Sequence, residues 1–285
     1  MRLGVTTFAT DRSLPVTELA RAVEERGLSS LYLPEHTHLP VATARTPGQD
    51  GVAEPYKRTL DPLVALAAAA AVTTRITLGT GILLAAQRDP IVTAKAIATL
   101  DLLAPGRVAV GVGFGWNRAE MEHHGVPYGE RREIARRHVL AMRTFWTEEE
   151  AAFDGVAPSW SWPKPSVPPP IYLGGAAGPK LFEHVGEYGD GWIPIGGSGI
   201  KAALPALREA CGGREVRVIP FGSRPTAEKL DYFAGLGITE VVANVPSGGA
   251  DVVLPVLDEL ALLAAAAGSG RSGDGTPGAA GGELP

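Results

Sequence analysis

The sequence predicts an α/β protein in which eight βα units close into a (β/α)8 barrel, also called a TIM barrel. Short apolar or β-branched segments alternate about eight times with longer segments of helical periodicity, the pattern of repeated βα units around a parallel sheet. Runs such as Val108-Ala109-Val110 have no polar face, as expected for parallel strands that are buried on both faces. The length of 285 residues also suits a single barrel, which commonly takes about 250 residues.

Each predicted strand is a short apolar run, and each is followed by a longer run with helical spacing of apolar residues. In chain order the predicted strands are Arg2–Thr6, Ser30–Pro34, Ile76–Thr80, Val108–Val112, Ile171–Gly174, Gly191–Pro194, Val216–Pro220 and Glu240–Asn244. The predicted helices are Val16–Arg26, Pro62–Val72, Ile91–Leu103, Glu130–Trp146, Lys180–Tyr188, Ile200–Ala210, Ala227–Leu236 and Val252–Ala267. The barrel domain therefore spans residues 1–267. Residues 268–285 are rich in Gly, Ser and Pro and are predicted to form a disordered tail.

Two long segments without clear periodicity interrupt the alternation, one after the second strand and one before the fifth. They run from His36 to Thr59 and from Thr147 to Pro170. Loops of this length in a compact domain are usually functional or disordered. The second contains Trp160, Trp162 and six prolines between 158 and 170, which stiffen the backbone. It is either a tether that packs its tryptophans on the barrel wall or a lid over the substrate.

The composition favours an enzyme that acts on small molecules in the cytoplasm. A net charge of −5 and a pI near 5.7 give no general attraction to nucleic acid or to an anionic membrane. Residues 1–9 lack the apolar core of a secretory signal, and the alanine-rich run at 63–72 is too short to cross a bilayer. Cys211 is the only cysteine, so an internal disulfide is impossible.

In a (β/α)8 barrel the reacting groups lie on loops that follow the C-terminal ends of strands. Glu35 and His36 close the second strand, where a carboxylate beside an imidazole can orient a substrate or transfer a proton. A solvated loop pair is the plainer alternative. His36 and His38 also suggest a zinc hydrolase, but the other histidines fall in predicted helices rather than at later strand ends. We therefore predict no metal site.

Three further strand ends are rich in glycine. Residues 78–84 offer either a backbone platform for a ring system or a tight turn. Residues 110–117 place Trp116 and Asn117 beside a G-x-G-x-G run that does not match the dinucleotide fingerprint. Residues 171–179 lead into a helix, whose free N–H groups could hold a cofactor phosphate near Lys180. Because no nucleophile elbow, P-loop or carboxylate dyad is present, we expect the reactivity to come from a cofactor.

Taken in this order, the four segments resemble the luciferase-like monooxygenase superfamily, and especially its branch that depends on the deazaflavin coenzyme F-420. The run from Gly111 to Glu120, with His124-Gly125-Val126 and Glu130-Arg131-Arg132, resembles the motif of that branch. Gly174-Gly175 and Gly189-Asp190-Gly191-Trp192 are similar to its fifth-strand and sixth-strand pattern. The resemblance covers about residues 1 to 265.

The resemblance implies a non-prolyl cis peptide between Gly81 and Ile82 that backs the central ring of the cofactor. It also implies that Glu35 and His36 lie near the reactive carbon. The implied cofactor-binding residues are Thr80, Gly81, Ile82, Gly113, Asn117, Gly174, Gly175 and Ala176. Phe114 replaces a glutamate that is a proposed proton donor in the sugar-phosphate dehydrogenases of this group. Phe114 and Trp116 are therefore predicted to line a pocket for a less polar substrate.

The sequence leads to one hypothesis and two rivals. The hypothesis is hydride transfer between coenzyme F-420 and a small organic substrate, with His36 as proton donor or acceptor. The first rival is a monooxygenase that uses reduced FMN in the same pocket. The second is a flavin-binding barrel without catalytic activity, since a fold alone does not determine function. Pairing of two barrels into a homodimer is left open.

Overall fold

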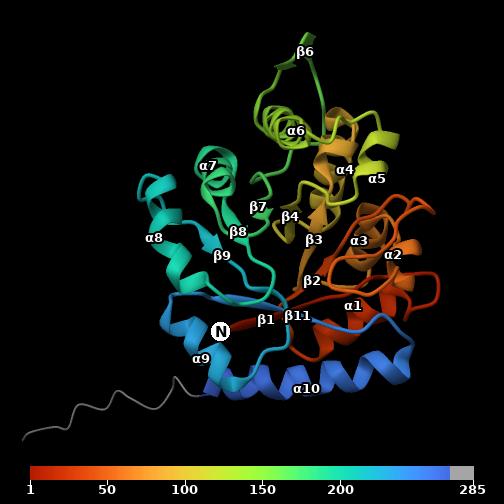
Figure 1. The fold of residues 1–285 in the computed structure, drawn as a ribbon, viewed down its shortest axis with the longest axis vertical. Helices are drawn as coiled ribbons and strands as arrows, with labels where there is room; N and C mark the ends of the chain where they lie inside the picture. The colour runs from red at the N-terminus through yellow and green to blue at the C-terminus, as the bar shows by residue number, and fades with distance from the viewer. Residues whose placement is uncertain (270–285) are drawn as a thin grey trace, which may run out of the picture.

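The computed structural model describes residues 1–269 and confirms the predicted fold class (Figure 1). Nine strands form one parallel sheet in the order β10-β11-β1-β2-β3-β4-β7-β8-β9. Their bounds are β1 Arg2–Thr6, β2 Ser30–Leu33, β3 Thr77–Leu83, β4 Val108–Val112, β7 Ile171–Gly174, β8 Gly191–Ile193, β9 Arg217–Val218, β10 Phe221–Ser223 and β11 Glu240–Asn244. The third strand is therefore longer than predicted and reaches past Thr80 to Leu83.

The sheet closes through two short strands, β9, which lies within the predicted strand Val216–Pro220, and β10, which follows Pro220 and was not predicted. Pro220 separates the two pieces because proline has no N–H to donate to the neighbouring strand. β9 pairs with β8, and β10 pairs with β11. A bridge between Ile195 and Phe221, with Phe221 N–H donating to the Pro194 carbonyl, joins β8 to β10 and completes the ring.

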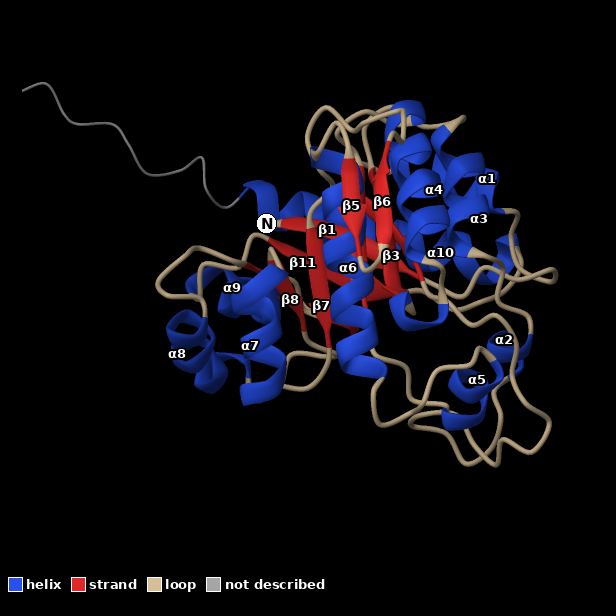
Figure 2. Cartoon of the chain, turned by 90° about the horizontal axis from the view of Figure 1, so that it is seen from above, coloured by secondary structure: helices blue, strands red, loops and turns tan. Residues whose placement is uncertain are grey.

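Eight helices surround the sheet, seven of them between strands and the last, α10, after β11 (Figures 1 and 2). They are α1 Val16–Glu25, α3 Pro62–Ala70, α4 Pro90–Leu103, α6 Arg131–Thr147, α7 Pro179–Tyr188, α8 Ile200–Ala210, α9 Ala227–Gly235 and α10 Ala250–Ser269. Asp61 and Asp89 precede the prolines that open α3 and α4, and their carboxylates accept backbone N–H groups of the first turn. α10 ends two residues beyond its predicted bound, and residues 270–285 of the predicted tail lie outside the described residues.

Short elements that the periodicity did not predict occur in the segments between units. They are α2 Glu54–Lys57, the 3-10 helix Ala85–Gln87, α5 Arg118–His123, and the antiparallel strands β5 Ala151–Phe153 and β6 Val156–Ser159. Each is too short to show a hydrophobic period. Figure 2 shows α2 and α5 with their loops on the same side of the barrel.

The segment with Trp160 and Trp162 lies outside the helical layer. The β5–β6 hairpin packs on α6, where Arg137 pairs with Asp154. Lys95 of α4 then donates a hydrogen bond to the Trp162 carbonyl. The segment therefore runs as a tether along α4 and α6. Both indoles are exposed, so the expected packing of the tryptophans on the wall is not observed.

The interior of the barrel is filled by its own cluster of side chains, separate from the larger core between the sheet and the helices. The members of this inner cluster are Tyr32, Ala109, Tyr172, Ile193, Ile219, Phe221 and Val242. The Tyr32 and Phe221 rings meet edge to face with centroids 5.6 Å apart. Ile82 packs on this inner cluster, so the cluster contacts the C-terminal end of β3.

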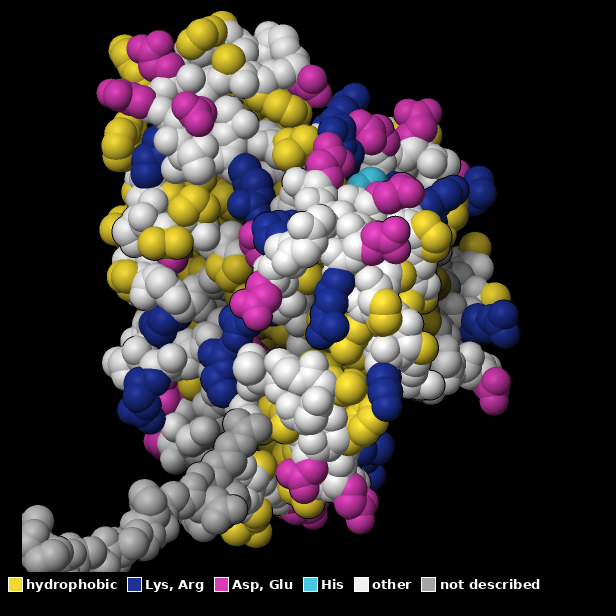
Figure 3. Space-filling view, turned by 90° about the vertical axis from the view of Figure 1, so that its left-hand side faces the viewer, with side chains coloured by type: hydrophobic (Ala, Val, Ile, Leu, Met, Phe, Trp, Pro, Cys, Tyr) yellow, Lys and Arg dark blue, Asp and Glu magenta, His cyan; other side chains and the backbone are white. Residues whose placement is uncertain are grey.

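On the face shown in Figure 3, Lys and Arg side chains alternate with Asp and Glu rather than forming a field of one sign. Among residues 1–269, no helix combines the length and the apolar character needed to cross a membrane.

Glu24, at the end of α1, fastens the turn before β3. Its carboxylate accepts the backbone N–H groups of Thr74, Arg75 and Ile76 at 2.9, 2.7 and 3.2 Å. Burial alone would raise the pKa of Glu24, but the N–H donors outweigh it and hold the pKa below its ordinary value. A carboxyl whose pKa is lowered by folding stabilises the fold above its unfolded pKa, and this contribution is lost as the pH falls.

We therefore expect Glu24→Gln to lower the free energy of unfolding at pH 7 by about 1 to 2 kcal/mol, measured by urea denaturation. The difference from wild type should shrink as the pH is lowered from about 5 to about 3. Glu25→Gln is the matched control, because Glu25 is exposed on the same helix turn. An equal loss at both ends of this pH range would contradict the assignment.

Candidate active site

His36 and Glu120 form a buried pair at the C-terminal end of β2. The His36 Nδ1–H donates to the Glu120 carboxylate at 2.7 Å, and the two side chains are 7% and 1% exposed. Glu120 also accepts the Thr37 backbone N–H at 3.1 Å. Because a carboxylate can only accept and the Trp116 indole N–H can only donate, these two contacts place a proton on Nδ1 and leave Nε2 as the acceptor.

The Nε2 side of His36 is enclosed by aromatic rings. The Trp116 indole N–H points at Nε2 at 3.3 Å, and the ring centroids lie 5.6 Å apart. The Tyr56 ring of α2 has its centroid 5.2 Å from that of the imidazole and packs in a tilted arrangement against Phe8. Both contacts come from the long segment after β2 and the glycine-rich segment after β4, so the structure brings these two predicted site segments together.

Glu35 is directed to a different partner. Its carboxylate accepts Arg88 Nε and the Leu84 backbone N–H, each at 2.6 Å, and the side chain is buried. Burial raises the pKa of Glu35, and Arg88 opposes this shift. The structure therefore brings Glu35 to Arg88 and not to the imidazole of His36. This ion pair links the ends of β2 and β3.

The end of β3 has the geometry that the resemblance implies. The peptide between Gly81 and Ile82 is cis, which confirms the prediction. Thr80 Oγ1 donates to the Gly111 carbonyl of β4 at 2.8 Å. A Cβ on Gly113 would lie 2.1 Å from Ile82 Cδ1, and a Cβ on Gly174 would lie 2.9 Å from Ile82 Cγ2. A Cβ at either position would displace the Ile82 side chain, so the two glycines leave room for Ile82 beside β4 and β7.

The turn from β7 into α7 presents backbone donors, as predicted. No hydrogen bond joins the N–H groups of Ala176 and Ala177 to any other residue in the described chain. Trp192 Nε1 holds the turn by donating to the Gly175 carbonyl at 2.9 Å. These exposed N–H groups suit an anion such as a cofactor phosphate.

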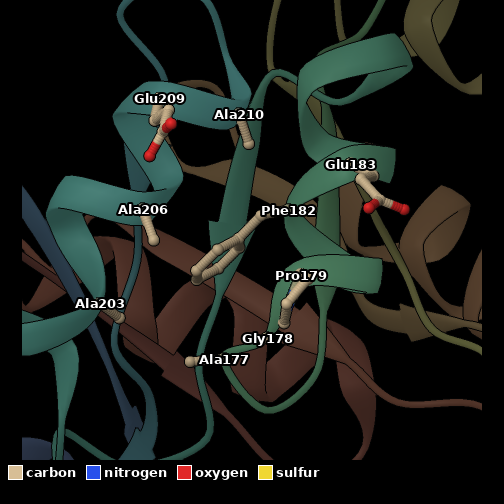
Figure 4. Close-up of a pocket in the computed structure, with 9 residues that line it drawn as sticks. All are labelled: Ala177, Gly178, Pro179, Phe182, Glu183, Ala203, Ala206, Glu209 and Ala210. Atoms are coloured by element: carbon tan, nitrogen blue, oxygen red, sulfur yellow. The ribbon is translucent and has the colours of Figure 1, made fainter.

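A hollow of about 560 Å³ lies beside this turn, between α7 and α8 (Figure 4). The Phe182 ring projects into it, opposite Ala203, Ala206 and Ala210 of α8. The ionisable residues in its lining are Glu183 and Glu209, which would repel a phosphate. The hollow therefore lies next to the predicted phosphate turn but does not extend it.

Asn117, which was predicted to bind the cofactor, and Phe114, which was predicted to line the substrate pocket, both make contacts with other residues of the protein. Asn117 caps α5 by accepting the Glu120 N–H, and its Nδ2 donates to Thr43 Oγ1 at 2.9 Å. The Phe114 ring packs against Arg132 of α6 and His184 of α7. The structure therefore places Trp116 beside His36, whereas Phe114 lies in the helical layer.

Sequence reasoning missed the role of Glu120. The spacing Asn117-x-x-Glu120 is that of a capping box, and it could have located α5 and placed Glu120 in its first turn. No local signal joins Glu120 to His36, because the two are 84 positions apart. Within residues 1–269, no group of three or more His, Cys, Asp or Glu side chains is arranged to hold a metal ion.

Comparison with known proteins finds a matching family model and similar sequences. Residues 6–228 match the family model of luciferase-like monooxygenases. The chain is 42% identical over 275 residues to an uncharacterised protein of Mycobacterium tuberculosis, covering 92% of this chain and 98% of that protein. It is 34% identical over 210 residues to an F-420-dependent glucose-6-phosphate dehydrogenase of Kineococcus radiotolerans, covering 68% of this chain and 57% of that enzyme.

The fold is also that of a solved deazaflavin enzyme. An F-420-dependent secondary alcohol dehydrogenase, in complex with an F-420–acetone adduct, superposes with a TM-score of 0.73 at 18% identity. The match covers 94% of this chain and 99% of that enzyme.

Proposed function

Because the chain belongs to the luciferase-like monooxygenase family, we propose that it is an oxidoreductase that transfers a hydride between coenzyme F-420 and a small organic substrate. The observation that carries the proposal is the His36–Glu120 pair, which holds an unprotonated Nε2 at the mouth of the barrel. A hydride transfer to or from a C–O bond requires such a proton acceptor or donor at the oxygen.

The residues present fit a deazaflavin. Gly113 and Gly174 leave room for Ile82, so the backbone of residues 80–82 forms the surface on which the ring system would rest. The free N–H groups at 176 and 177 would hold its phosphate. When bound, the deazaflavin supplies a carbon that accepts or donates a hydride.

The protein residues then handle the proton. During oxidation of an alcohol, the substrate hydroxyl replaces the Trp116 N–H at His36 Nε2, and Nε2 accepts the hydroxyl proton as the hydride leaves the adjoining carbon and the carbonyl forms. During reduction, the same atom returns the proton to the carbonyl oxygen. Glu120 stabilises the imidazolium and holds the ring in position through Nδ1. Trp116 and Tyr56 exclude water from this side of the imidazole.

The test is turnover of F-420 by the full chain with a panel of secondary alcohols, followed by the loss of absorbance at about 420 nm. A panel of ketones and reduced F-420 tests the reverse direction. We expect substrate-dependent reduction of F-420. Oxygen consumption with reduced FMN, and no reaction with F-420, would replace the proposal by the monooxygenase alternative. Tight binding of F-420 without turnover of any substrate would favour the non-catalytic barrel.

A further inference from the structure

Glu120 connects the buried His36 to a chain of polar side chains that ends at the surface. Thr37 Oγ1 lies 3.5 Å from Glu120 Oε1, 2.7 Å from His124 Nε2 and 3.0 Å from His38 Nδ1. His38 Nε2 lies 2.8 Å from His123 Nδ1, with the two rings stacked. The hydrogen-bonded series therefore runs from His36 through Glu120 and Thr37 to three histidines.

Burial changes sharply along this series. His36 and Glu120 are buried, whereas Thr37, His38, His123 and His124 are exposed. On its other side the imidazole faces Trp116 and Tyr56, and a bound cofactor and substrate would close that side further. A proton that reaches His36 from the substrate consequently has its shortest route to water through Nδ1 and Glu120.

We propose that Glu120 and Thr37 form a proton path between His36 and the exposed histidines. The inference rests on the proposed function, because it explains how the site exchanges a proton with water while the substrate covers it. Neither residue touches the reacting atoms, so both act through His36.

In the oxidation direction, a proton moves along the path in a series of transfers. After Nε2 has taken the substrate proton, the Nδ1–H bond breaks and a proton moves to Glu120 Oε2. The carboxyl group turns and passes a proton to Thr37 Oγ1, whose own proton moves to His124 Nε2 or His38 Nδ1. Water then takes a proton from the histidine, which leaves Glu120 as a carboxylate and His36 neutral with its proton on Nε2. Once the product has left, Nε2 loses this proton to water and Nδ1 regains one from Glu120 along the path, so the Nδ1–H form returns. The reverse order supplies a proton for reduction.

Several neighbouring groups shift the pKa of His124, which stands at the histidine end of the path. Burial lowers the pKa of His124, the nearby His38 and His123 lower it further, and Glu120 acts in the opposite direction. A lowered pKa favours the neutral imidazole, which has one ring nitrogen without a proton that can accept the Thr37 hydroxyl proton.

The test compares Thr37→Val with Thr37→Ser in the full chain without cofactor. Valine keeps the shape and the backbone N–H bond to Glu120 but removes the hydroxyl, and serine restores it. The readout is the rate at which the His36 Nδ1–H exchanges with water, measured by NMR of the imidazole N–H. We expect Thr37→Val to slow the exchange by about tenfold or more and Thr37→Ser to leave it near the wild-type rate. The exposed Thr99→Val on α4 should change nothing.

A second readout uses the loaded enzyme. The Thr37→Val variant should show a lower kcat, a larger solvent isotope effect and partial rescue by imidazole buffer, with no change in KM. An unchanged exchange rate in Thr37→Val overturns the path, whatever the activity. If wild type fails to reduce F-420 while the exchange rate still responds to Thr37, the proposed function falls and the path stands.

Discussion

Replacing His36 by asparagine is expected to lower the rate of hydride transfer by about 10²- to 10⁴-fold, the usual contribution of one general acid–base group. The asparagine Nδ2 can still donate to Glu120, so the buried carboxylate keeps a partner. What the substitution removes is the Nε2 atom that takes the substrate proton. The effect should therefore fall on the rate constant of hydride transfer, measured in a single turnover at about 420 nm, with little change in F-420 affinity.

The matched control is His138→Asn on α6. His138 donates from Nδ1 to the Ala85 carbonyl, and asparagine can make a similar bond away from the barrel mouth. This variant should keep the wild-type rate. Equal activity of His36→Asn and wild type would remove His36 from the reaction and would favour either a different proton donor or a barrel that only binds the cofactor.

The second large effect is expected for Gly111→Ala on β4. A Cβ at this position would lie 2.3 Å from the Thr80 carbonyl oxygen and 3.0 Å from Ile193 Cδ1. A backbone atom cannot move aside as a flexible side chain can, so β3 and β4 must separate beside residues 80–82. We expect a loss of about 3 kcal/mol in the free energy of unfolding, near the upper end of the usual cost of overpacking.

The same substitution should weaken cofactor binding. If binding requires the native position of residues 80–82, a distortion of this energy lowers the affinity for F-420 by about a hundredfold. Urea denaturation and a fluorescence titration measure the two effects separately. Gly129→Ala is the control, since no atom lies within 4 Å of its added Cβ. If Gly111→Ala kept the stability and the F-420 affinity of the wild type, the close approach of Gly111 to Thr80 would not be what holds residues 80–82 in place.

The barrel was predictable because each βα unit carries its own signal. The strands β1, β4, β7 and β11 have the predicted bounds, and the glycine runs marked the strand ends that form the platform. The cis peptide at Gly81–Ile82 came from the family resemblance and not from any local pattern.

The pairings within the site were not predictable in the same way. The chain gives no local signal that His36 meets Glu120 or that Glu35 meets Arg88, because each pair depends on how separate strand ends come together. Adjacent residues in the sequence thus face different partners. His36 lies beside Trp116 and Tyr56, whereas Glu35 forms an ion pair with Arg88. Phe114 and Trp116 diverge for the same reason, since their side chains leave the segment in different directions.

The central claim, that this barrel mouth is built for a deazaflavin, is tested most directly by titrating the purified full chain with oxidised F-420 and, separately, with FMN, following fluorescence. We expect binding of F-420 with a micromolar or tighter Kd and clearly weaker binding of FMN. Preferential binding of FMN would contradict the claim and assign the site to oxygen-dependent chemistry. Binding of neither compound would contradict the cofactor assignment as a whole.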